Sequence, residues 1–376
     1  MKKLTVVIVS YNVCYYLEQC LNSVLKAARD IDHEIYVVDN ASSDDTVSFI
    51  SHRFSQQVNI IESQHNLGFA RANNIAIKQT QSEYVLLLNP DTFIAEDTLQ
   101  QVLDFMDSHP RAGGVGVKMH NADGTVAQES RRGLPTPWVS MLKMLGRSKR
   151  YYMSHLSWDE PGQIEVISGA FCMLRRKVLD QVGLLDEDFF MYGEDIDLSY
   201  RILKGGYENW YVPATMLHYK GESTKKSTYR YVHVFYQAML IFFRKHYGHL
   251  SFLVTVPIRL AIYFRALIAL IHMQYWRMRQ YLGFSNRRGA ETQYFFSGSQ
   301  QMIEDCKLLA KRKGLQANFG NANDSINPNS CMVYDTGTFS FGQIISEAKK
   351  NADRKLLVGT YYKDSKTIIS PKEIIR

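Results

Sequence analysis

The stretch VVIVSYN at residues 6–12, with IYVVDNASSDDT at residues 35–46, decides the fold. Each begins as a β-branched apolar run and ends abruptly in polar residues, which is typical of a buried strand in a parallel sheet. Between them, residues 15–28 repeat apolar side chains at helical spacing: Tyr16, Cys20, Val24 and Ala27. These segments predict a strand–helix–strand unit whose two strands carry polar side chains at their tips.

The same unit repeats along the first 110 residues. We expect strands at residues 58–63 and 84–92 and helices at 68–80 and 95–110, the last ending at Pro110. This alternation predicts an open, doubly wound α/β sheet, and such sheets bind ligands beyond the carboxyl ends of their strands. The polar residues expected at those ends are Ser10, Tyr11, Asn12, Asp39, Asn40, Asn89 and Asp91.

The composition fits a globular protein with one large domain and a smaller one. The chain has 376 residues, of which 45% are hydrophobic and 22% charged, and this length exceeds what a single core usually supports. The five cysteines are scattered and none lies in a C-x-x-C pair. Neither a disulfide framework nor a zinc site is therefore indicated, and a reducing compartment fits. The apolar run at residues 4–9 is too short for a signal peptide and is expected to be the first strand.

Three regions are predicted. Residues 1–225 form the main domain, whose second half has strand candidates at 113–120, 164–176 and 207–213 and a helix at 195–206. Residues 226–288 form a basic, aromatic helical region, and residues 289–376 alternate strands and helices again. This last region predicts a small Rossmann-like α/β domain. Its FSGS turn at 296–299 lacks a G-x-G-x-x-G run, so we expect it to serve packing or partner contact.

Two carboxylates stand at predicted strand ends. Asp39 can accept hydrogen bonds from a nucleotide base and a ribose; the alternative is a plain helix start capped by Ser43 or Asp44. Asp91, in the turn that follows three leucines, can hold a divalent cation against a diphosphate; the alternative is an ordinary Asn-Pro-Asp turn.

A third acidic group begins the helix near residue 195. Glu194, Asp195 and Asp197 crowd its first turn, where the helix dipole favours anions whatever their function. The apolar run at residues 189–192 comes just before them and is expected to desolvate a carboxylate and raise its basicity. A base that faces a sugar hydroxyl needs such a setting.

Seven short motifs, in this order, resemble a known family: VVIVSYN, VVDNASSDDT, NLGFARANN, LLLNPDT, SGAF, FFMYGEDIDLSYRILKGGY and HYKGES. The set is similar to the family 2 glycosyltransferases of the GT-A fold, and most of all to the bacterial rhamnosyltransferase-like enzymes. The resemblance covers residues 4–225. It implies a GT-A doubly wound mixed sheet followed by basic amphipathic helices and the small α/β domain.

The resemblance assigns roles residue by residue. It implies that Asp39 contacts the base of a nucleotide-diphosphate sugar and that Asp195 is the catalytic base, next to Glu194. The remaining donor-binding residues that it implies are Ser10, Tyr11, Asn12, Asn66, Gly68, Arg71, Asn74, Asn89 and Gly169.

The resemblance also implies a Mg²⁺ or Mn²⁺ site. Asp91 is its carboxylate ligand in a motif that departs from D-x-D, because the first position is Asn89. His218 helps to hold the metal or the diphosphate, with a structural histidine as the alternative. Arg131 and Arg132 are candidates to pair with phosphates of donor or acceptor, with a solvated basic pair as the alternative.

The basic region predicts membrane association. Between residues 220 and 290 twelve basic residues stand against one acidic residue. Arg259 and Arg265 interrupt the apolar run at 251–276, so no uncharged stretch reaches the ~18 residues of a spanning helix, and an interfacial element is expected. A core-packing helical pair and a homodimer interface are alternatives, whereas nucleic-acid binding is disfavoured because no such motif accompanies the charge.

The sequence therefore predicts an inverting, metal-dependent glycosyltransferase. It would move a sugar, with rhamnose as the candidate, from a nucleotide diphosphate to a lipid-linked glycan acceptor during cell-surface polysaccharide synthesis. Its expected location is the cytoplasmic face of the cell membrane, as a peripheral protein. The alternative is a non-catalytic assembly protein that binds the sugar nucleotide with the same fold.

Overall fold

The structure is a computed structural model that describes residues 1–220, 229–248, 292–319 and 330–376, with single residues and pairs between 256 and 281. Two arginines of the predicted interfacial run, Arg259 and Arg265, lie outside the described residues, as does the end of the HYKGES motif after residue 220. Among the described residues, no helix combines the length and apolar character that a membrane crossing requires.

The larger sheet in the described chain has nine strands, in the order β3-β2-β1-β4-β8-β6-β9-β5 with β7 added to β9. Strands β1 to β4 run parallel, β8 lies antiparallel between β4 and β6, and β9 is parallel to β6. The strand bounds are β1 (Leu4–Ser10), β2 (His33–Asp39), β3 (Asn59–Glu62), β4 (Tyr84–Leu88), β5 (Thr92–Ile94), β6 (Ala112–Asn121), β7 (Gly162–Ile164), β8 (Phe171–Arg175) and β9 (Glu208–His218).

The order of the strands fixes where a ligand can bind. The chain moves outward from β1 to β2 and β3 and then returns to place β4 on the other side of β1. Ser10 and Asp39 are paired in register at the ends of β1 and β2, and Asn89 follows β4 directly. In a doubly wound sheet the crevice at such a reversal, outside the carboxyl ends of the strands, is the ligand site.

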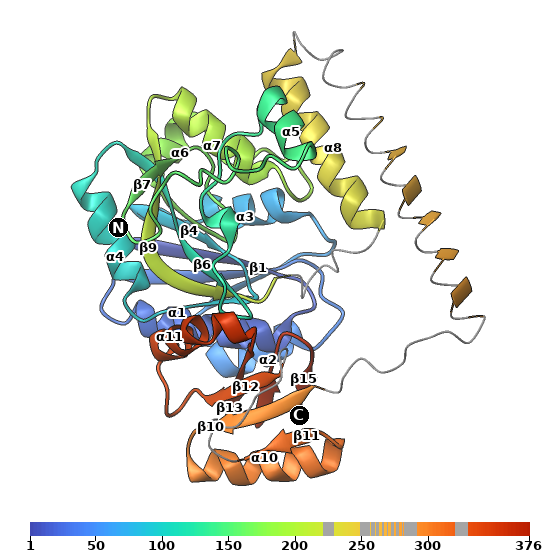
Figure 1. Cartoon of the computed structure of the whole chain (residues 1–376). Coiled ribbons are helices and arrows are strands. Elements are labelled where there is room, and N and C mark those ends of the chain that lie inside the picture. The colour runs from blue at the N-terminus through green and yellow to red at the C-terminus, as the bar shows by residue number, and fades with distance from the viewer. Residues whose placement is uncertain are drawn as a thin grey trace.

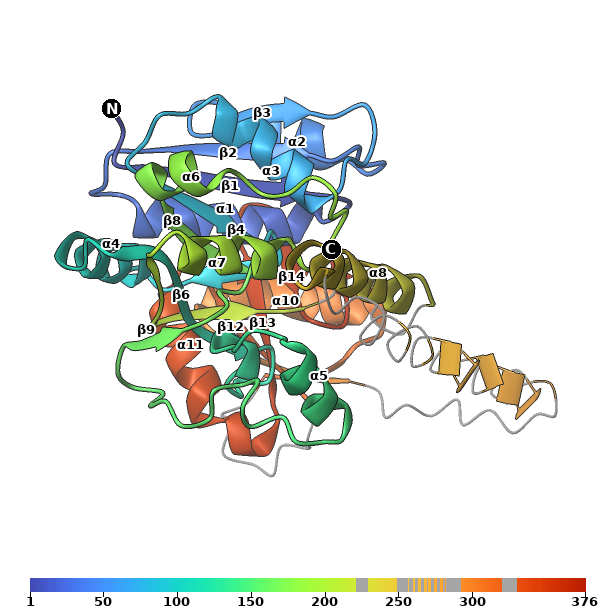
Figure 2. The same cartoon turned by 90° about the horizontal axis from the view of Figure 1, so that it is seen from above.

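Both faces of this sheet are buried, which explains the continuous apolar runs in the strands. Val6 and Ile8 of β1 belong to a core formed with α1 (Cys14–Ala27), α2 (Thr46–Phe54) and α4 (Thr98–Ser108). Val7 and Val9 belong to a second core formed with α3 (Phe69–Lys78), α6 (Arg176–Val182) and α7 (Glu194–Lys204). Figure 1 shows α3, α6 and α7 on one side of the sheet and α1 and α2 on the other, and Figure 2 looks down on the former set.

The predicted elements of the first 110 residues are confirmed, with bounds that shift by a few residues, except that the strand predicted at 84–92 ends at Leu88 and Thr92 begins the separate strand β5. Two later strands differ from their predictions. The segment 164–176 is broken into the end of β7 and β8, because Ser168 accepts from the backbone N–H of Phe171 and turns the chain. Strand β9 runs on past Pro213 to His218, since a bulge opposite Val117 and Lys118 takes the proline out of the ladder.

A second sheet lies in the C-terminal region, drawn in orange and red in Figure 1. Its order within the described residues is β11-β10-β12-β13-β14-β15, with parallel pairing from β11 to β13. Helices α10 (Gln300–Lys313) and α11 (Phe341–Lys350) accompany it, and the short η3 (Ala352–Arg354) follows α11. The strand bounds are β10 (Gln293–Ser297), β11 (Gln316–Asn318), β12 (Cys331–Asp335), β13 (Leu357–Tyr362), β14 (Thr367–Ile369) and β15 (Ile374–Ile375).

The FSGS turn before α10 is filled by the protein itself. Asp335 accepts hydrogen bonds from the backbone N–H and the hydroxyl of Ser299, at 3.1 and 2.6 Å. A Cβ on Gly298 would lie 2.3 Å from the Cβ of Asp335. A carboxylate therefore occupies the place where a phosphate-binding loop would hold its anion.

The described chain also contains η1 (Gln128–Ser130) and α5 (Pro137–Met144) in the main region and α8 (Tyr229–His246) in the predicted basic region. Helix α8 packs on α7, because Phe242 and Phe243 share a core with Ile196 and Phe189. The His246 Nε2 also lies 2.7 Å from a carboxylate oxygen of Asp197. The predicted boundary at residues 225 and 226, like the other domain limits, stays a prediction.

Candidate active site

The tips of β1 and β2 are tied to each other by polar contacts. Asn12 has a left-handed φ of 55°, which lets its side-chain oxygen accept from the backbone N–H of Ser43 at 2.7 Å. The Asp39 carboxylate is buried and accepts from the backbone N–H and hydroxyl of Ser42, at 2.8 and 2.5 Å. The predicted donor residues Asn12 and Asp39 are thus brought together through the Ser42–Ser43 turn. The N-cap of α2 by position is Asp45, but the Asp44 carboxylate accepts from the backbone N–H of Thr46, the first residue of the helix, at 3.2 Å, so the capping alternative holds in part for Asp44.

Ser10 and Tyr11 offer polar groups at the same edge. Ser10 is fully buried, and its hydroxyl finds no hydrogen-bond partner among the described residues. Tyr11 is 38% exposed. A buried hydroxyl without a partner is uncommon in a native protein, so a ligand atom is a natural partner for Ser10.

Asn40 links β2 to the loop before α3. Its side-chain amide donates to the Asn66 side-chain oxygen at 3.0 Å and accepts from the Leu67 backbone N–H at 2.8 Å. The sequence placed Asn40 at a strand end without assigning it a role. Only the structure shows that it positions the loop that carries Asn66 and Gly68.

Gly68 is required by its surroundings. It has a φ of +79°, and a Cβ there would lie 2.3 Å from the carbonyl oxygen of Phe190. The backbone N–H of Phe69 donates to that same carbonyl at 2.7 Å. The loop before α3 thus rests on the apolar segment that leads into Asp195.

Two other predicted donor residues lie away from the strand tips. Asn74 is buried, and its amide bonds the Leu185 carbonyl at 2.8 Å and the Glu187 carboxylate at 3.0 Å. Arg71 is exposed, with its Nε 3.9 Å from Glu187. Asn74 is therefore occupied in holding the 185–187 segment, and direct contact of Arg71 with a donor stays a prediction.

The ends of β4 and β9 bring the predicted metal residues together. The His218 Nε2 lies 3.1 Å from Asp91 Oδ1, and the Asn89 side-chain nitrogen lies 3.5 Å from that Nε2. Asp91 is buried, and the other ring nitrogen of His218 has no hydrogen-bond partner among the described residues. Within the described ranges no group of three or more His, Cys, Asp or Glu side chains could hold a metal. Among the described residues, Asp91 and His218 therefore offer a metal two ligand atoms, one carboxylate oxygen and one imidazole nitrogen.

Asp195 stands at the start of α7 and pairs with Arg132. Its Oδ2 accepts from the Arg132 guanidinium and from the Gly169 backbone N–H at 3.2 Å. Its Oδ1 accepts from the Ile196 N–H at 2.9 Å. Burial disfavours the charged guanidinium, but the charge of Asp195 outweighs this and raises the pKa of Arg132 above its usual value. The carboxylate is thus fixed in orientation by three donors.

The desolvation predicted from the apolar approach falls on Glu194. This side chain is buried and its Oε2 has no hydrogen-bond partner among the described residues. Burial, and then the charge of Asp195, raise the pKa of Glu194 well above its usual value. Of the two neighbouring carboxyls, Glu194 is thereby pushed toward its neutral form.

Arg131 does not reach the Asp195 cluster. Its guanidinium is buried, lies 3.3 Å from the centroid of the Trp158 ring and donates to the Leu156 carbonyl. Burial lowers its pKa from the usual value. Arg131 therefore stabilises the core, whereas its neighbour Arg132 faces the site.

Comparison with known proteins identifies the family. The family model described as Glycosyl transferase family 2 matches residues 5–183. An N-acetylglucosaminyl-diphospho-decaprenol L-rhamnosyltransferase of Mycobacterium tuberculosis is 30% identical in an alignment 260 residues long, which covers 64% of this chain and 83% of that protein. The chain belongs to glycosyltransferase family 2. The family match and the sheet order together confirm the predicted GT-A fold, and the chain is a glycosyltransferase.

Other relatives of this family 2 glycosyltransferase are more distant. A poly-beta-1,6-N-acetyl-D-glucosamine synthase of Staphylococcus aureus is 26% identical over 216 residues, 57% of this chain and 48% of the synthase. The solved structure of S. aureus TarS 1-349 is 21% identical with a TM-score of 0.44, and the match covers 64% of each chain. The mannosyltransferase PcManGT of Pyrobaculum calidifontis, solved with GDP-Man and Mn²⁺, is 18% identical with a TM-score of 0.48 over 76% of this chain and 81% of that one. The chain thus spans about half of the synthase and somewhat less than two thirds of the TarS structure.

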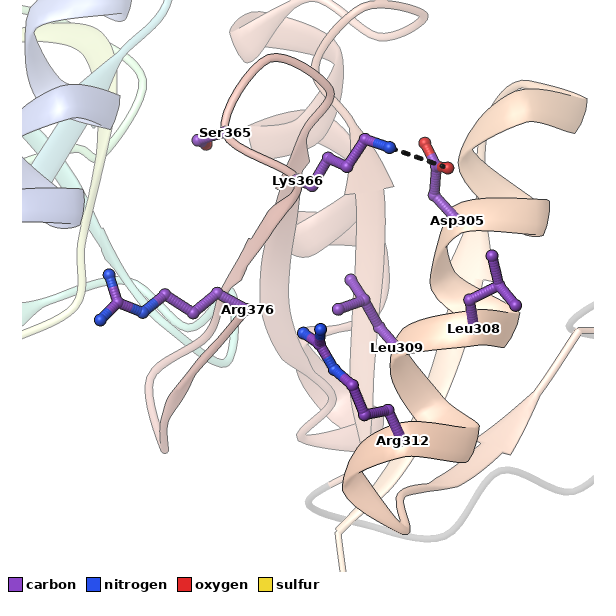
Figure 3. A pocket seen from close by; sticks show the side chains of 7 residues that line it. All are labelled: Asp305, Leu308, Leu309, Arg312, Ser365, Lys366 and Arg376. Atoms are coloured by element: carbon purple, nitrogen blue, oxygen red, sulfur yellow. Dashed lines mark ion pairs between the residues drawn. The ribbon is translucent and has the colours of Figure 1, made fainter.

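A cavity of about 440 Å³ lies in the C-terminal region, between α10 and the segment that follows β13. Figure 3 shows Arg312 and Arg376 on its wall, and the Lys366 Nζ lies 3.9 Å from Asp305. None of the predicted site residues lines it. The cavity is therefore separate from the strand ends of the larger sheet.

Proposed function

We propose that this family 2 glycosyltransferase transfers a sugar from a nucleotide diphosphate to a lipid-linked glycan, with inversion and with a divalent metal. The observation that carries the proposal is the presence of two pairs, Asp91 with His218 at the ends of β4 and β9, and Asp195 with Arg132 at the start of α7. A nucleotide sugar has a diphosphate at one end of its reacting bond and a sugar at the other. The first pair suits the diphosphate, and the second suits the acceptor hydroxyl.

On the donor side, the nucleoside would lie against the tips of β1 and β2. The Ser10 hydroxyl, which lacks a partner among the described residues, and the Asp39 carboxylate, fixed by Ser42, are groups that can bond a base or ribose. Asn40 supports Asn66 and Gly68 next to them. These contacts would orient the donor with little reorganisation on binding, because the groups are already held in place.

The residues present fit a divalent metal. A carboxylate oxygen and an imidazole nitrogen are both accepted by Mn²⁺, and Mg²⁺ in proteins commonly uses one or two protein ligands and takes the others from water and substrate phosphates. Asp91 and His218 would hold the ion, with Asn89 beside them. When bound, the ion supplies charge stabilisation to the departing nucleoside diphosphate.

Asp195 would act on the acceptor. Its carboxylate accepts the proton of the acceptor hydroxyl as that oxygen bonds to the anomeric carbon, and the bond from this carbon to the diphosphate oxygen breaks. One displacement inverts the configuration of the anomeric carbon. Arg132 and the Gly169 N–H would keep the carboxylate aimed while the proton arrives.

The sugar and the acceptor are proposed from the mycobacterial relative, whose name specifies an L-rhamnosyl transfer to a decaprenol-linked acceptor. Rhamnose and a polyprenyl-diphosphate glycan are therefore our candidates, in the synthesis of a cell-surface polysaccharide. A peripheral position at the cytoplasmic face of the membrane suits such an acceptor. It is supported by exposed apolar residues of the basic region: Val256, Leu260, Tyr263, Phe264, Leu267, Ile268, Leu270, Ile271, Tyr275, Met278 and Tyr281.

The experiment is a screen of purified protein for nucleoside diphosphate release. Nucleotide sugars would be offered with a synthetic polyprenyl-diphosphate N-acetylglucosamine, with and without Mn²⁺. We expect one donor to be turned over, and Asp91→Ala to lose the metal stimulation while its circular dichroism stays unchanged. Full activity of Asp91→Ala in excess chelator would remove the metal role. Donor binding without turnover across the panel would favour a non-catalytic assembly protein.

A further inference from the structure

Helix α5 (Pro137–Met144) carries an apolar face that no described part of the protein covers. Trp138 is 57% exposed, Met141 is 44% exposed and Leu145, at the C-cap, is 69% exposed. Their spacing of three and four residues puts them on one side of the helix. Single exposed apolar residues are ordinary, but three large ones side by side mark a contact surface.

The segment around this face is strongly basic. Residues 137–150 contain Lys143, Arg147, Lys149 and Arg150 and no acidic residue. Arg147, Lys149 and Arg150 are exposed. A short helix with tryptophan and leucine on one side, followed by exposed basic residues, has the chemistry that lies in the headgroup layer of an anionic membrane.

The inner side of α5 leads to the reaction centre. The Lys143 ammonium lies 3.5 Å from the centroid of the Tyr151 ring. Burial, and then the charge of Arg132, lower the pKa of Lys143 to about 8. The Tyr151 carbonyl accepts from the backbone N–H of Gly133 at 2.7 Å, and Gly133 follows Arg132 directly in the chain. Because Arg132 pairs with Asp195, the contacts of Lys143 and Tyr151 connect α5 to the segment that holds the proposed base.

We propose that α5 is a membrane-contact helix whose Trp138–Met141–Leu145 face enters an anionic bilayer and brings the Asp195 cluster to the membrane surface. The proposal rests on the proposed function, because a lipid-linked acceptor presents its diphosphate at that surface. It adds a contact next to the reaction centre that is distinct from the basic region at residues 226–288. Lys143 and Arg132, between this face and Asp195, would then meet the diphosphate of the acceptor.

The test uses the fluorescence of Trp138 on vesicles of phosphatidylcholine and phosphatidylglycerol in equal parts. Vesicles with brominated acyl chains quench a tryptophan that enters the bilayer. The chain has four tryptophans, so the comparison is between the parent and Trp138→Phe, which keeps the other three. We expect bromine-dependent quenching in the parent that falls markedly in Trp138→Phe. Equal quenching in both proteins would overturn the proposal, since Trp138 would then lie outside the bilayer.

A second measurement removes the apolar face. Met141→Glu with Leu145→Glu should lower vesicle partitioning by roughly tenfold or more, because two large apolar contacts are lost and negative charge is added. The matched control is Leu308→Glu, a leucine that is 70% exposed on α10. Figure 1 shows α10 at the opposite end of the molecule from α5. We expect no change in the control. An equal loss in both would overturn the proposal, as would a parent dimer that the double variant converts to monomer, because a second copy would then cover this face.

Failure of this inference is separable from failure of the proposed function. Quenching and partitioning need no turnover, so they judge α5 even if no donor or acceptor is found. Conversely, a water-soluble acceptor with the same headgroup should be used equally well by the parent and the Met141→Glu, Leu145→Glu variant. A loss with the soluble acceptor as large as that with the vesicle-bound acceptor would show that the face serves the fold and not the membrane.

Discussion

Replacing Asp195 by Asn tests the proposed base and also the ion pair around it. Asp195 Oδ2 receives two donors, the Arg132 guanidinium and the Gly169 N–H. An asparagine placed there offers one oxygen and one NH₂ group, and it leaves the charge of Arg132, whose side chain is 12% exposed, without its anion. Breaking a buried ion pair from one side costs about 3–5 kcal/mol. Because Arg132 also donates to the Ile167 carbonyl at 2.9 Å, we expect a loss near the lower end, about 3 kcal/mol.

The rate of sugar transfer should fall by more than a smaller folded fraction of the protein would explain. Loss of general-base help typically costs ~10² to 10⁴ in rate. Thermal unfolding and sugar transfer would be measured on two variants: the single variant Asp195→Asn, and a double variant that combines Arg132→Met with Asp195→Asn. Replacing both partners by neutral groups removes the unpaired charge, so the double variant should regain much of the stability. It should not regain the rate.

Two outcomes would refute this reasoning. Transfer by Asp195→Asn at the parent rate would remove Asp195 from the chemistry. Recovery of the rate together with stability in the double variant would show that Asp195 only neutralises Arg132. Donor affinity, measured by calorimetry, should stay unchanged in both variants, because the proposed donor contacts come from the strand tips.

Two further changes probe the neighbouring residues. Burial and the charge of Asp195 raise the pKa of Glu194 above the usual 4.5. Above pH 4.5 the folded state therefore keeps a proton that the unfolded state releases. The free energy of unfolding then falls as the pH rises from 4.5 through the pKa of the folded state. Glu194→Gln should therefore be more stable than the parent at alkaline pH, by about 1.4 kcal/mol for each unit by which folding raises the pKa of Glu194. In urea titrations this advantage should disappear toward about pH 4. A difference in stability that stays constant at all pH values would contradict the argument. Gly68→Ala should slow transfer and destabilise the protein by roughly 2 kcal/mol or more, because its Cβ would meet the Phe190 carbonyl in addition to the φ strain. Gly206→Ala is the matched control, with a φ of +82° and nothing within 4 Å, and a loss as large in it would assign the effect to backbone strain alone.

Most of the larger sheet could be predicted from the sequence, because the strands of this sheet are buried on both faces. An apolar run that ends in polar residues, as at Ser10 and Asp39, locates both a strand and its tip. The same logic fails where the partner is distant in sequence. The sequence around Asn74 does not show whether its side chain binds the sugar nucleotide or another part of the protein. In the structure its amide group bonds the backbone of Leu185.

Arg131 and Arg132 show this limit most clearly. The two are chemically identical neighbours, so composition and spacing treat them alike. In an extended chain successive side chains point in opposite directions, and here one stacks on Trp158 while the other reaches Asp195. Which arginine faces which side depends on the register of the 131–132 segment against Val166, and that register is set by the packing of the whole region.

The C-terminal region packs against the residues next to the proposed metal site. Phe341 of α11 contacts Phe93 of β5, and Phe93 contacts Tyr219, the residue after His218.

Polar contacts run along the same route. Thr360 of β13 donates to the Gln19 side chain at 3.2 Å, and Gln19 donates to the Tyr219 hydroxyl at 3.4 Å. Glu96 accepts from the first two backbone N–H groups of α11, at 2.7 and 2.9 Å, so a carboxylate of the main region caps a helix of the C-terminal one.

These contacts converge on the backbone that carries Asp91 and His218. The Tyr219 N–H donates to the Asp91 carbonyl at 3.0 Å, so Tyr219 is bonded to one proposed metal ligand and follows the other, His218, in the chain. The C-terminal region therefore contacts residues next to the strand ends of the larger sheet. Its own FSGS turn is filled by the Asp335 carboxylate. These contacts favour the predicted packing role of the small α/β unit, because they join it to the residue that follows His218.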